Sequence, residues 1–139
     1  MNREGSFKIE CRLPTVLEFQ RLRNSTNWDK LEDSAVEIGI SNTIFSVCVL
    51  LNESIIGMAR IVGDGALYYY IQDVIVLPKF RRIGIGKTMM NEIEKYLAEN
   101  APRNAFIGLM SAEGVKEFYL QFGYKPRNSQ APGMFKIKS

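Results

Sequence analysis

The spacing of apolar and polar residues at the start of the chain predicts a strand followed by a helix. Residues 7–13 alternate between apolar and polar side chains, as a half-buried strand does, and Pro14 interrupts the alternation. Thr15, with Glu18 three positions later, is a capping-box signature, so we expect a helix to begin at residue 16. The apolar face of this helix is predicted to hold Val16, Phe19 and Leu22.

The middle of the chain is predicted to hold a loop, a second helix and three strands. Residues 24–27 are polar and are typical of a loop. We expect the second helix to begin near Asp29, with a buried stripe formed by Leu31, Ala35 and Ile38. Residues 63–65, Gly-Asp-Gly, suit a hairpin turn between the last two strands, and the length of the final strand favours a β-bulge. The three strands are expected over residues 43–51, 54–62 and 66–77.

After Pro78 the pattern alternates between helices and strands. One strongly amphipathic helix ends before Pro102 and has apolar residues at four-residue spacing, namely Ile85, Met89, Ile93 and Leu97. A shorter helix is predicted over residues 113–122, closed by Gly123. Further strands are predicted over residues 105–110, 124–125 and 134–138. The order β-α-α-β-β-β-α-β-α-β-β describes one α/β domain over residues 1–139, a mixed sheet with helices on both faces.

Composition narrows the chemistry available to this fold. The chain has 139 residues, 46% of them hydrophobic and 24% charged, which suits a single globular domain. It contains no histidine, which excludes a Ser-His-Asp triad, a Cys-His pair and a histidine-ligated metal. Cys11 and Cys48 match no zinc or redox spacing, so we expect no metal and two free thiols in a reducing cytoplasm.

No targeting or membrane segment is visible in the sequence. The first six residues are polar and of mixed charge, unlike a signal peptide. The longest apolar run, at residues 47–51, is far shorter than the ~20 residues that a membrane helix needs. We therefore expect a cytoplasmic protein with no membrane partner.

The positive charge of the chain is concentrated in one short segment. The net charge is +3, from 18 Lys and Arg against 15 Asp and Glu. Four cations without an acid among them stand between residues 78 and 89, and the rest of the chain carries 14 basic and 15 acidic residues. These cations are Lys79, Arg81, Arg82 and Lys87. Such a patch favours a compact anionic ligand over nucleic acid, which usually requires more dispersed contacts.

The same segment contains glycines where a strand leads into a helix. Gly84 and Gly86 allow backbone N–H groups to approach an anion closely, and the following helix adds the positive end of its dipole. Together with the cations they predict a cradle for a pyrophosphate, although a tight strand-to-helix turn is the structural alternative. The segment is neither a P-loop nor a dinucleotide fingerprint, because the required glycines are missing and residue 89 is Met89.

Two motifs resemble those of the GCN5-related N-acetyltransferase superfamily. Val76-Leu77-Pro78 followed by Arg81-Arg82-Ile83-Gly84-Ile85-Gly86 resembles its acetyl-CoA-binding signature, Arg/Gln-x-x-Gly-x-Gly/Ala. Glu117-Phe118-Tyr119-Leu120-Gln121-Phe122-Gly123-Tyr124 resembles its second hallmark, an aromatic-Tyr pair before Phe-Gly-aromatic. The order of the predicted elements agrees with this superfamily over nearly the whole chain.

This resemblance implies a binding mode for acetyl-CoA as co-substrate. A V-shaped opening is expected between the strands at residues 66–77 and 105–110, the fourth and fifth of the sheet. The pantetheine arm would bind the backbone of this strand around Ile75, through Val74 and Val76. The diphosphate would lie on the amides of Arg81, Arg82, Ile83, Gly84, Ile85, Gly86 and Lys87. The family typically transfers acetyl directly to a primary amine, and the absence of a paired nucleophile and base in the chain fits direct attack.

Aminolysis of a thioester needs a stabilised oxyanion, a neutral amine and a proton for the departing thiolate. Backbone N–H groups at a bulge near Val74 are candidates for stabilising the oxyanion. Tyr119 matches the general acid of the family, with a core aromatic as the alternative. Without histidine the base is a carboxylate, with or without an intervening water. Asp73 and Glu113 are the candidates, against an ion pair for Asp73 and a helix N-terminal charge for Glu113.

The acceptor side is less defined by the sequence. Trp28 and Asp29 offer aromatic and acidic contacts that suit a cationic amine, and Tyr70 is a third candidate, with sheet packing as its alternative. Residues 111–114 lack the asparagine that the family often has before its second motif, which leaves the positioning of the acceptor open.

Three functions are consistent with these residues. The first is transfer of acetyl to the amine of a small metabolite. The second keeps the fold and makes a protein N-terminus or lysine the acceptor. The third is a non-catalytic acyl-CoA-binding sensor, in which Tyr119 only packs. A homodimer is expected by analogy with the family, and no nucleic-acid partner is expected.

Overall fold

The computed structural model describes residues 6–139 and contains one five-stranded sheet in the order β1-β2-β3-β4-β5. Neighbouring strands are antiparallel except β4 and β5, which are parallel. The strands are β1 (Phe7–Glu10), β2 (Phe45–Leu51), β3 (Ser54–Gly63), β4 (Tyr68–Val76) and β5 (Phe106–Leu109). The helices are α1 (Val16–Arg23), α2 (Asp33–Ser41), α3 (Ile85–Asn100), α4 (Lys116–Leu120) and the single 3₁₀ turn η1 (Pro78–Phe80).

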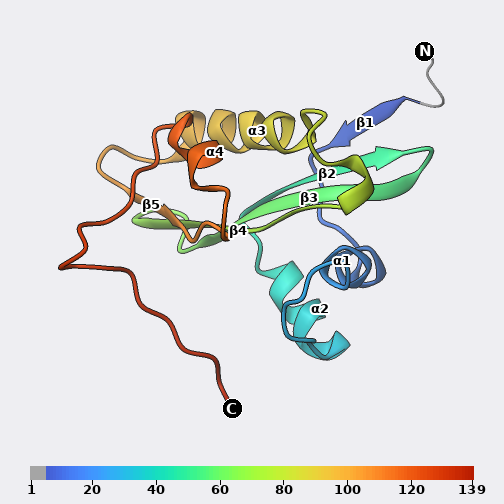
Figure 1. Cartoon of the computed structure of the whole chain (residues 1–139), viewed down its shortest axis with the longest axis horizontal. Coiled ribbons are helices and arrows are strands. Elements are labelled where there is room, and N and C mark those ends of the chain that lie inside the picture. Colours follow the sequence, from blue (N-terminus) through green and yellow to red (C-terminus); the bar gives the residue numbers. More distant parts are fainter. Residues whose placement is uncertain (1–5) are drawn as a thin grey trace.

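Helices cover both faces of the sheet, as the alternation of elements predicts. Figure 1 shows α3 and α4 on one face and α1 and α2 on the other. The central strands β2 and β3 are consequently buried on both faces and form near-continuous apolar runs. The core beneath α3 includes Met89, Met90 and Ile93, and the core beneath α1 and α2 includes Phe19, Leu22 and Ile40. None of the helices within residues 6–139 has the length and apolar character that crossing a bilayer requires.

Helix α1 forms as the sequence predicts. The Thr15 side chain accepts a hydrogen bond from the Glu18 amide, and the Glu18 carboxylate accepts one from the Thr15 amide, both at 3.0 Å. This reciprocal pair satisfies two amide donors that a helix start would otherwise leave unpaired. Phe19 and Leu22 are buried, and Val16 is half-buried.

The prediction for the second helix is wrong in its start and in its buried face. Helix α2 begins at Asp33, four residues later than expected, and Val36 and Ile40 are its buried residues. Of the predicted stripe, Leu31 precedes the helix and Ile38 is 65% exposed. Apolar residues occur on two faces of α2, and contact with Phe19 and Leu22 of α1 decides which face is buried.

Strand β4 contains the bulge that its length favours. Met58 of β3 pairs with Ile75, and Arg60 pairs with Gln72, so two residues of β4 lie opposite the single residue Ala59. Asp73, one of those two, has a φ of +56°.

The predicted V-shaped opening between the fourth and fifth strands is confirmed by the strand register. Pairing between β4 and β5 stops at Ile71 and Leu109, although β4 continues to Val76. The last residues of β4 therefore pair with β3 on one side and do not pair with β5 on the other.

The C-terminal region differs most from expectation. Helix α4 begins at Lys116 rather than 113, because Gly114, with a φ of +84°, turns the chain just before it. Gly123 adopts a left-handed φ of +94° after the helix, as its predicted closing role requires. No strand forms over residues 124–139, and Met134 is 86% exposed. An extended segment gains ladder hydrogen bonds only when a partner strand is present, and alternation alone cannot reveal that partner.

Candidate active site

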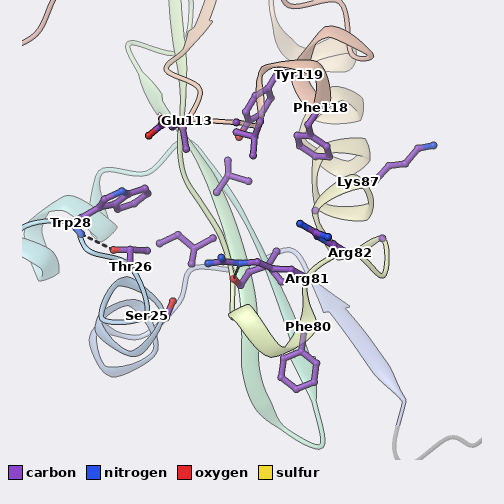
Figure 2. Close-up of a pocket in the computed structure, with 18 of the residues that line it drawn as sticks. Ser25, Thr26, Trp28, Phe80, Arg81, Arg82, Lys87, Glu113, Phe118 and Tyr119 are labelled. Atoms are coloured by element: carbon purple, nitrogen blue, oxygen red, sulfur yellow. Dashed lines mark hydrogen bonds between the residues drawn. The ribbon is translucent and has the colours of Figure 1, made fainter.

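A cationic, glycine-containing turn joins the end of β4 to α3. Arg82 and Gly84 have left-handed φ values of +68° and +95°, and Gly84 is the N-cap of α3. Alternation of right- and left-handed residues directs successive amides into one concavity, and the first amides of a helix have no intrahelical acceptor. Figure 2 shows Arg81 and Arg82 reaching toward the cavity beside this turn, while Lys87 extends outward from α3. This arrangement is suited to a pyrophosphate.

Gly86 permits close packing between this turn and α4. A Cβ atom built at residue 86 would lie 3.4 Å from the Phe118 ring, at the short limit of ordinary van der Waals contact. Phe118 in turn packs edge-on against Tyr119 and Phe122, with ring centroids 5.0 and 5.4 Å apart. The anion-binding turn and the helix that carries Tyr119 are therefore in direct contact.

Two neighbouring cavities open around these elements. The first cavity, of about 970 Å³, contains the cationic turn, the end of β4 and α4. The second cavity, of about 560 Å³, extends from the α1–α2 loop across the bulge to the residues after β5. Five residues line both cavities: Asn27, Trp28, Val74, Ala112 and Tyr119.

Tyr119 therefore lies where the two cavities meet. Its side chain is buried, and its hydroxyl makes no hydrogen bond to any group within residues 6–139. Burial raises the pKa of Tyr119 above the ordinary tyrosine value of about 10, so the hydroxyl stays protonated at neutral pH. A protonated hydroxyl at this junction can donate to an atom that enters from either side.

The unpaired edge of β4 faces the first cavity. The Leu77 amide donates to the Ile56 carbonyl at 2.9 Å, so position 77 faces β3. Because backbone polar groups alternate along a strand, those of Val74 and Val76 face the opening left by β5. The Val76 carbonyl accepts a hydrogen bond there from Arg81 Nε at 2.9 Å, which also holds the arginine at the end of the strand.

The two candidate bases occupy different surroundings. Asp73 is 7% exposed, lies in the bulge and lines the second cavity, and both of its carboxylate oxygens contact arginines. Glu113 is exposed, lines the first cavity and precedes α4 in a turn, so it is not part of the helix. The structure thus brings Tyr119 and both carboxylates to the two cavities. The contacts of Asp73 with arginines are the ion pair that was the alternative to a role as base.

Of the predicted acceptor residues, two reach the cavities and one does not. Trp28 lines both cavities, and Asp29 lines the second. Tyr70 lines neither, because it pairs with Gly108 of β5, and its ring covers that glycine at 3.5 Å from where a Cβ would be. Tyr70 packs within the sheet, which was the alternative to an acceptor contact.

Several lining residues carry no signal that would identify them in the sequence. Ser25, Thr26 and Asn27 are predicted only as a loop, yet they line the first cavity. Figure 2 shows Ser25 and Thr26 across the cavity from Arg81. The Thr26 hydroxyl accepts a hydrogen bond from the Trp28 amide at 3.1 Å and holds this loop. Met110, Ser111 and Ile137 enter the second cavity from distant parts of the chain.

The cofactor residues predicted from the glycine motif divide into side-chain and backbone contributors. Arg81, Arg82, Gly84, Gly86 and Lys87 line the first cavity, as do Val74, Ile75 and Val76. The Ile83 side chain is exposed and the Ile85 side chain belongs to the core under α3, so only their amides can contribute.

The cysteines lie outside this site. Cys11 and Cys48 are free thiols, and neither lines either of the two cavities described above. Burial raises the pKa of the Cys48 thiol to about 11, which keeps it unreactive at neutral pH.

Comparison with known proteins agrees with this geometry. The acetyltransferase (GNAT) domain model matches residues 43–126. An uncharacterized N-acetyltransferase, ycf52, of Pyropia yezoensis is 25% identical over 124 residues, covering 86% of this chain and 70% of that protein. Histone acetyltransferase TAP1 of Glycine max is 33% identical over 81 residues, covering 58% of this chain and 34% of that protein.

A solved structure shares the whole fold. A Staphylococcus aureus protein of unknown function, described as a probable acetyltransferase, superimposes with a TM-score of 0.90 at 26% identity. The match covers 96% of this chain and all of that one, 100%. The sheet, the opening between β4 and β5, and the cationic turn together define the class of acyl-group transferases. The chain belongs to the GNAT acetyltransferase family, whose members use acyl-CoA.

Proposed function

We propose that this protein transfers acetyl from acetyl-CoA directly to the primary amine of a small metabolite. The observation that carries the proposal is the meeting of two cavities at Tyr119 and Val74, one lined by cations and one by Trp28 and Asp29. A reaction between an anionic acyl donor and an amine requires such a pair of sites with a shared boundary.

The residues of the first cavity fit acetyl-CoA. Arg81 and Arg82, with the amides at the start of α3, would hold the diphosphate. The backbone of Val74 and Val76 would bind the pantetheine arm as an added strand. Acetyl-CoA then supplies a thioester, whose carbonyl carbon is the electrophile.

Direct transfer forms the nitrogen–carbon bond while the carbon–sulfur bond breaks. The amine loses one proton to the base, and the thiolate gains one from the Tyr119 hydroxyl, so the products are an acetamide and a CoA thiol. Return of the proton from the base, through solvent, restores the Tyr119 hydroxyl. Amides at the bulge near Val74 would stabilise the oxyanion. Neither cavity contains a cysteine, and the chain offers no histidine to activate a serine, which favours direct attack over a covalent acyl-enzyme.

A protein acceptor is the second candidate, and one relative favours it. The similarity to a histone acetyltransferase favours a lysine acceptor, although the match spans only 34% of that protein. The second cavity, about 560 Å³ in volume, matches the size of small-molecule sites, which favours a metabolite.

Thiol release from acetyl-CoA, measured against a panel of amines, tests the proposal. The panel contains polyamines, amino acids and amino sugars, with a lysine peptide and a free N-terminal peptide as the protein arm. Mass spectrometry of the product locates the acetyl group. We expect turnover with a small amine. Turnover with peptides alone supports the protein acceptor. Binding of CoA without any turnover identifies a sensor and contradicts the enzyme.

A further inference from the structure

A buried carboxylate occupies the most unusual backbone position in the sheet. Asp73 lies in the bulge of β4 with a φ of +56°, a left-handed conformation that is unfavourable for a non-glycine residue. Asp73 is only 7% exposed. Both the conformation and the buried charge need compensating contacts.

Two arginines supply these contacts from opposite directions. Arg60 Nε donates to Asp73 Oδ2 at 2.8 Å, and Arg23 Nη1 lies 3.5 Å from Asp73 Oδ1. Their side chains are 15% and 16% exposed, so the three charges form one largely desolvated cluster.

Each arginine connects the bulge to a different part of the fold. Arg60 Nη1 donates to the Gly39 carbonyl at 3.1 Å and to Thr43 Oγ1 at 2.8 Å, at the end of α2. Arg60 therefore connects the bulge to the end of α2.

Arg23 connects the bulge to the wall of the second cavity. Arg23 Nε donates to the Asp29 carbonyl at 3.2 Å, and its guanidinium lies 5.2 Å from the centre of the Trp28 ring. The loop that carries Trp28 and Asp29 has no regular structure of its own, and this arginine is one of the side chains that hold it, together with Thr26. The residue next to Asp73 is Val74, which lines both cavities.

We propose that Asp73 is a positioning residue, whose carboxylate holds the bulge at Val74 and the Trp28–Asp29 wall in one fixed relation through Arg60 and Arg23. The proposal rests on the proposed function, since it assigns that wall to the amine acceptor. It replaces the role of base for Asp73. A carboxylate that takes a proton from the amine loses the charge that holds both arginines, and the wall would loosen in each cycle.

Fluorescence of Trp28, the single tryptophan of the chain, tests the linkage without any assay of activity. In Asp73→Asn the amide keeps the shape of the side chain and loses its charge. We expect greater quenching of Trp28 by acrylamide, because Arg23 is no longer held against the ring. Asp64→Asn is the control for loss of a hydrogen-bonded aspartate charge: the Asp64 carboxylate accepts backbone hydrogen bonds, at 2.8 to 3.1 Å, in a hairpin turn outside both cavities. Quenching in this control should equal that of the wild type.

Steady-state kinetics separate positioning from base catalysis. We expect Asp73→Asn to raise the KM for the amine roughly ten-fold and the KM for acetyl-CoA by less, because Val74 of the bulge lines both cavities. Arg23→Gln should do the same, and the double variant should lose little more than either single variant, since one linkage is broken in all three. A fall in kcat with an unchanged amine KM and unchanged Trp28 quenching identifies a base and overturns the proposal.

The remaining outcomes are also decisive. If Asp73→Asn lowers the melting temperature but leaves quenching and amine KM as in the wild type, the carboxylate is only structural and the proposal fails. If Asp73→Asn does not fold, Arg23→Gln retains the pair between Asp73 and Arg60 and is tested through its amine KM. A wild-type amine KM in Arg23→Gln would show that the linkage does not hold the acceptor wall, and would overturn the proposal. If the wild type acetylates no amine, the proposed function fails, while Trp28 quenching still decides whether the linkage exists.

Discussion

The two cavities of this protein are built in different ways. One continuous stretch, residues 74–87, supplies the strand edge, the cations and the helix start of the first cavity. The second cavity is assembled from the end of α1, the loop after it, the bulge of β4, the residues after β5, and Ile137. The loop after α1 and helix α4 complete the wall of the first cavity, but its cations and its strand edge come from one segment and leave a motif in the sequence. A site assembled from many segments leaves only isolated residues.

This difference implies that the two cavities respond separately to substitution. Changes in the continuous stretch should affect the acyl donor, and changes in the assembled wall should affect the acceptor. Tyr119 lies on the shared boundary and should affect the chemical step itself.

Tyr119→Phe should have the largest effect. We expect kcat to fall roughly a hundred-fold with both KM values little changed, because the proton donor is lost while the ring keeps its packing. Since burial raises the pKa of this hydroxyl, the wild type should show no alkaline loss of kcat due to Tyr119 below about pH 10.

Tyr124→Phe is the matched control for that variant. Tyr124 packs against Tyr119 and donates a hydrogen bond to Glu94, but lines neither cavity. The kcat of Tyr124→Phe should stay at the wild-type value. A wild-type kcat in Tyr119→Phe would remove the proton donor from the mechanism.

Ile40→Ala should lower the free energy of unfolding by about 2 kcal/mol, because Ile40 belongs to the core that supports the second cavity. Ile38→Ala removes the same atoms from the same helix at a site that is 65% exposed, and should cost less than about 0.5 kcal/mol. Urea denaturation measures both. Equal losses would mean that α2 does not pack through the face described above.

Arg82→Asn should raise the KM for acetyl-CoA roughly five- to ten-fold and leave the amine KM unchanged, because one charge-assisted contact to the diphosphate is lost. Asparagine tolerates the left-handed φ of +68° at this position, so the turn should persist. Lys79→Gln removes the same charge from a neighbouring residue outside the cavity and serves as control. Similar increases in the KM for acetyl-CoA in both variants would indicate a general effect of positive charge rather than a specific contact with Arg82.

Asp29→Asn should have the smallest effect, an increase of roughly three-fold in the KM for a cationic amine, since an exposed carboxylate contributes little. Glu32→Gln is a suitable control, because Glu32 is exposed nearby and lines neither cavity. An equal effect with a neutral acceptor would show that Asp29 does not act through its charge.

Much of the fold and most of the first cavity could be predicted, because local rules determine them. The Thr15–Glu18 capping box, the four-residue spacing of Ile85 to Leu97 and the bulge of β4 all depend on neighbouring residues. The buried face of α2 depends instead on contact with α1. The expected strands after residue 123 depend on a partner that β5 does not provide, and Ile137 reaches the second cavity through chain geometry alone.

The exposed C-terminal segment has a practical consequence for anyone handling the protein. Phe135 is 75% exposed on a backbone without regular structure, which makes it a preferred cleavage site for proteases that cut after aromatic residues. Cleavage there removes Ile137 from the second cavity and leaves the cationic turn intact. A partly cleaved preparation would thus contain two forms of the protein. We expect the two forms to bind the acyl donor equally well and the acceptor with different affinities. Intact-mass analysis should therefore precede any comparison of amines.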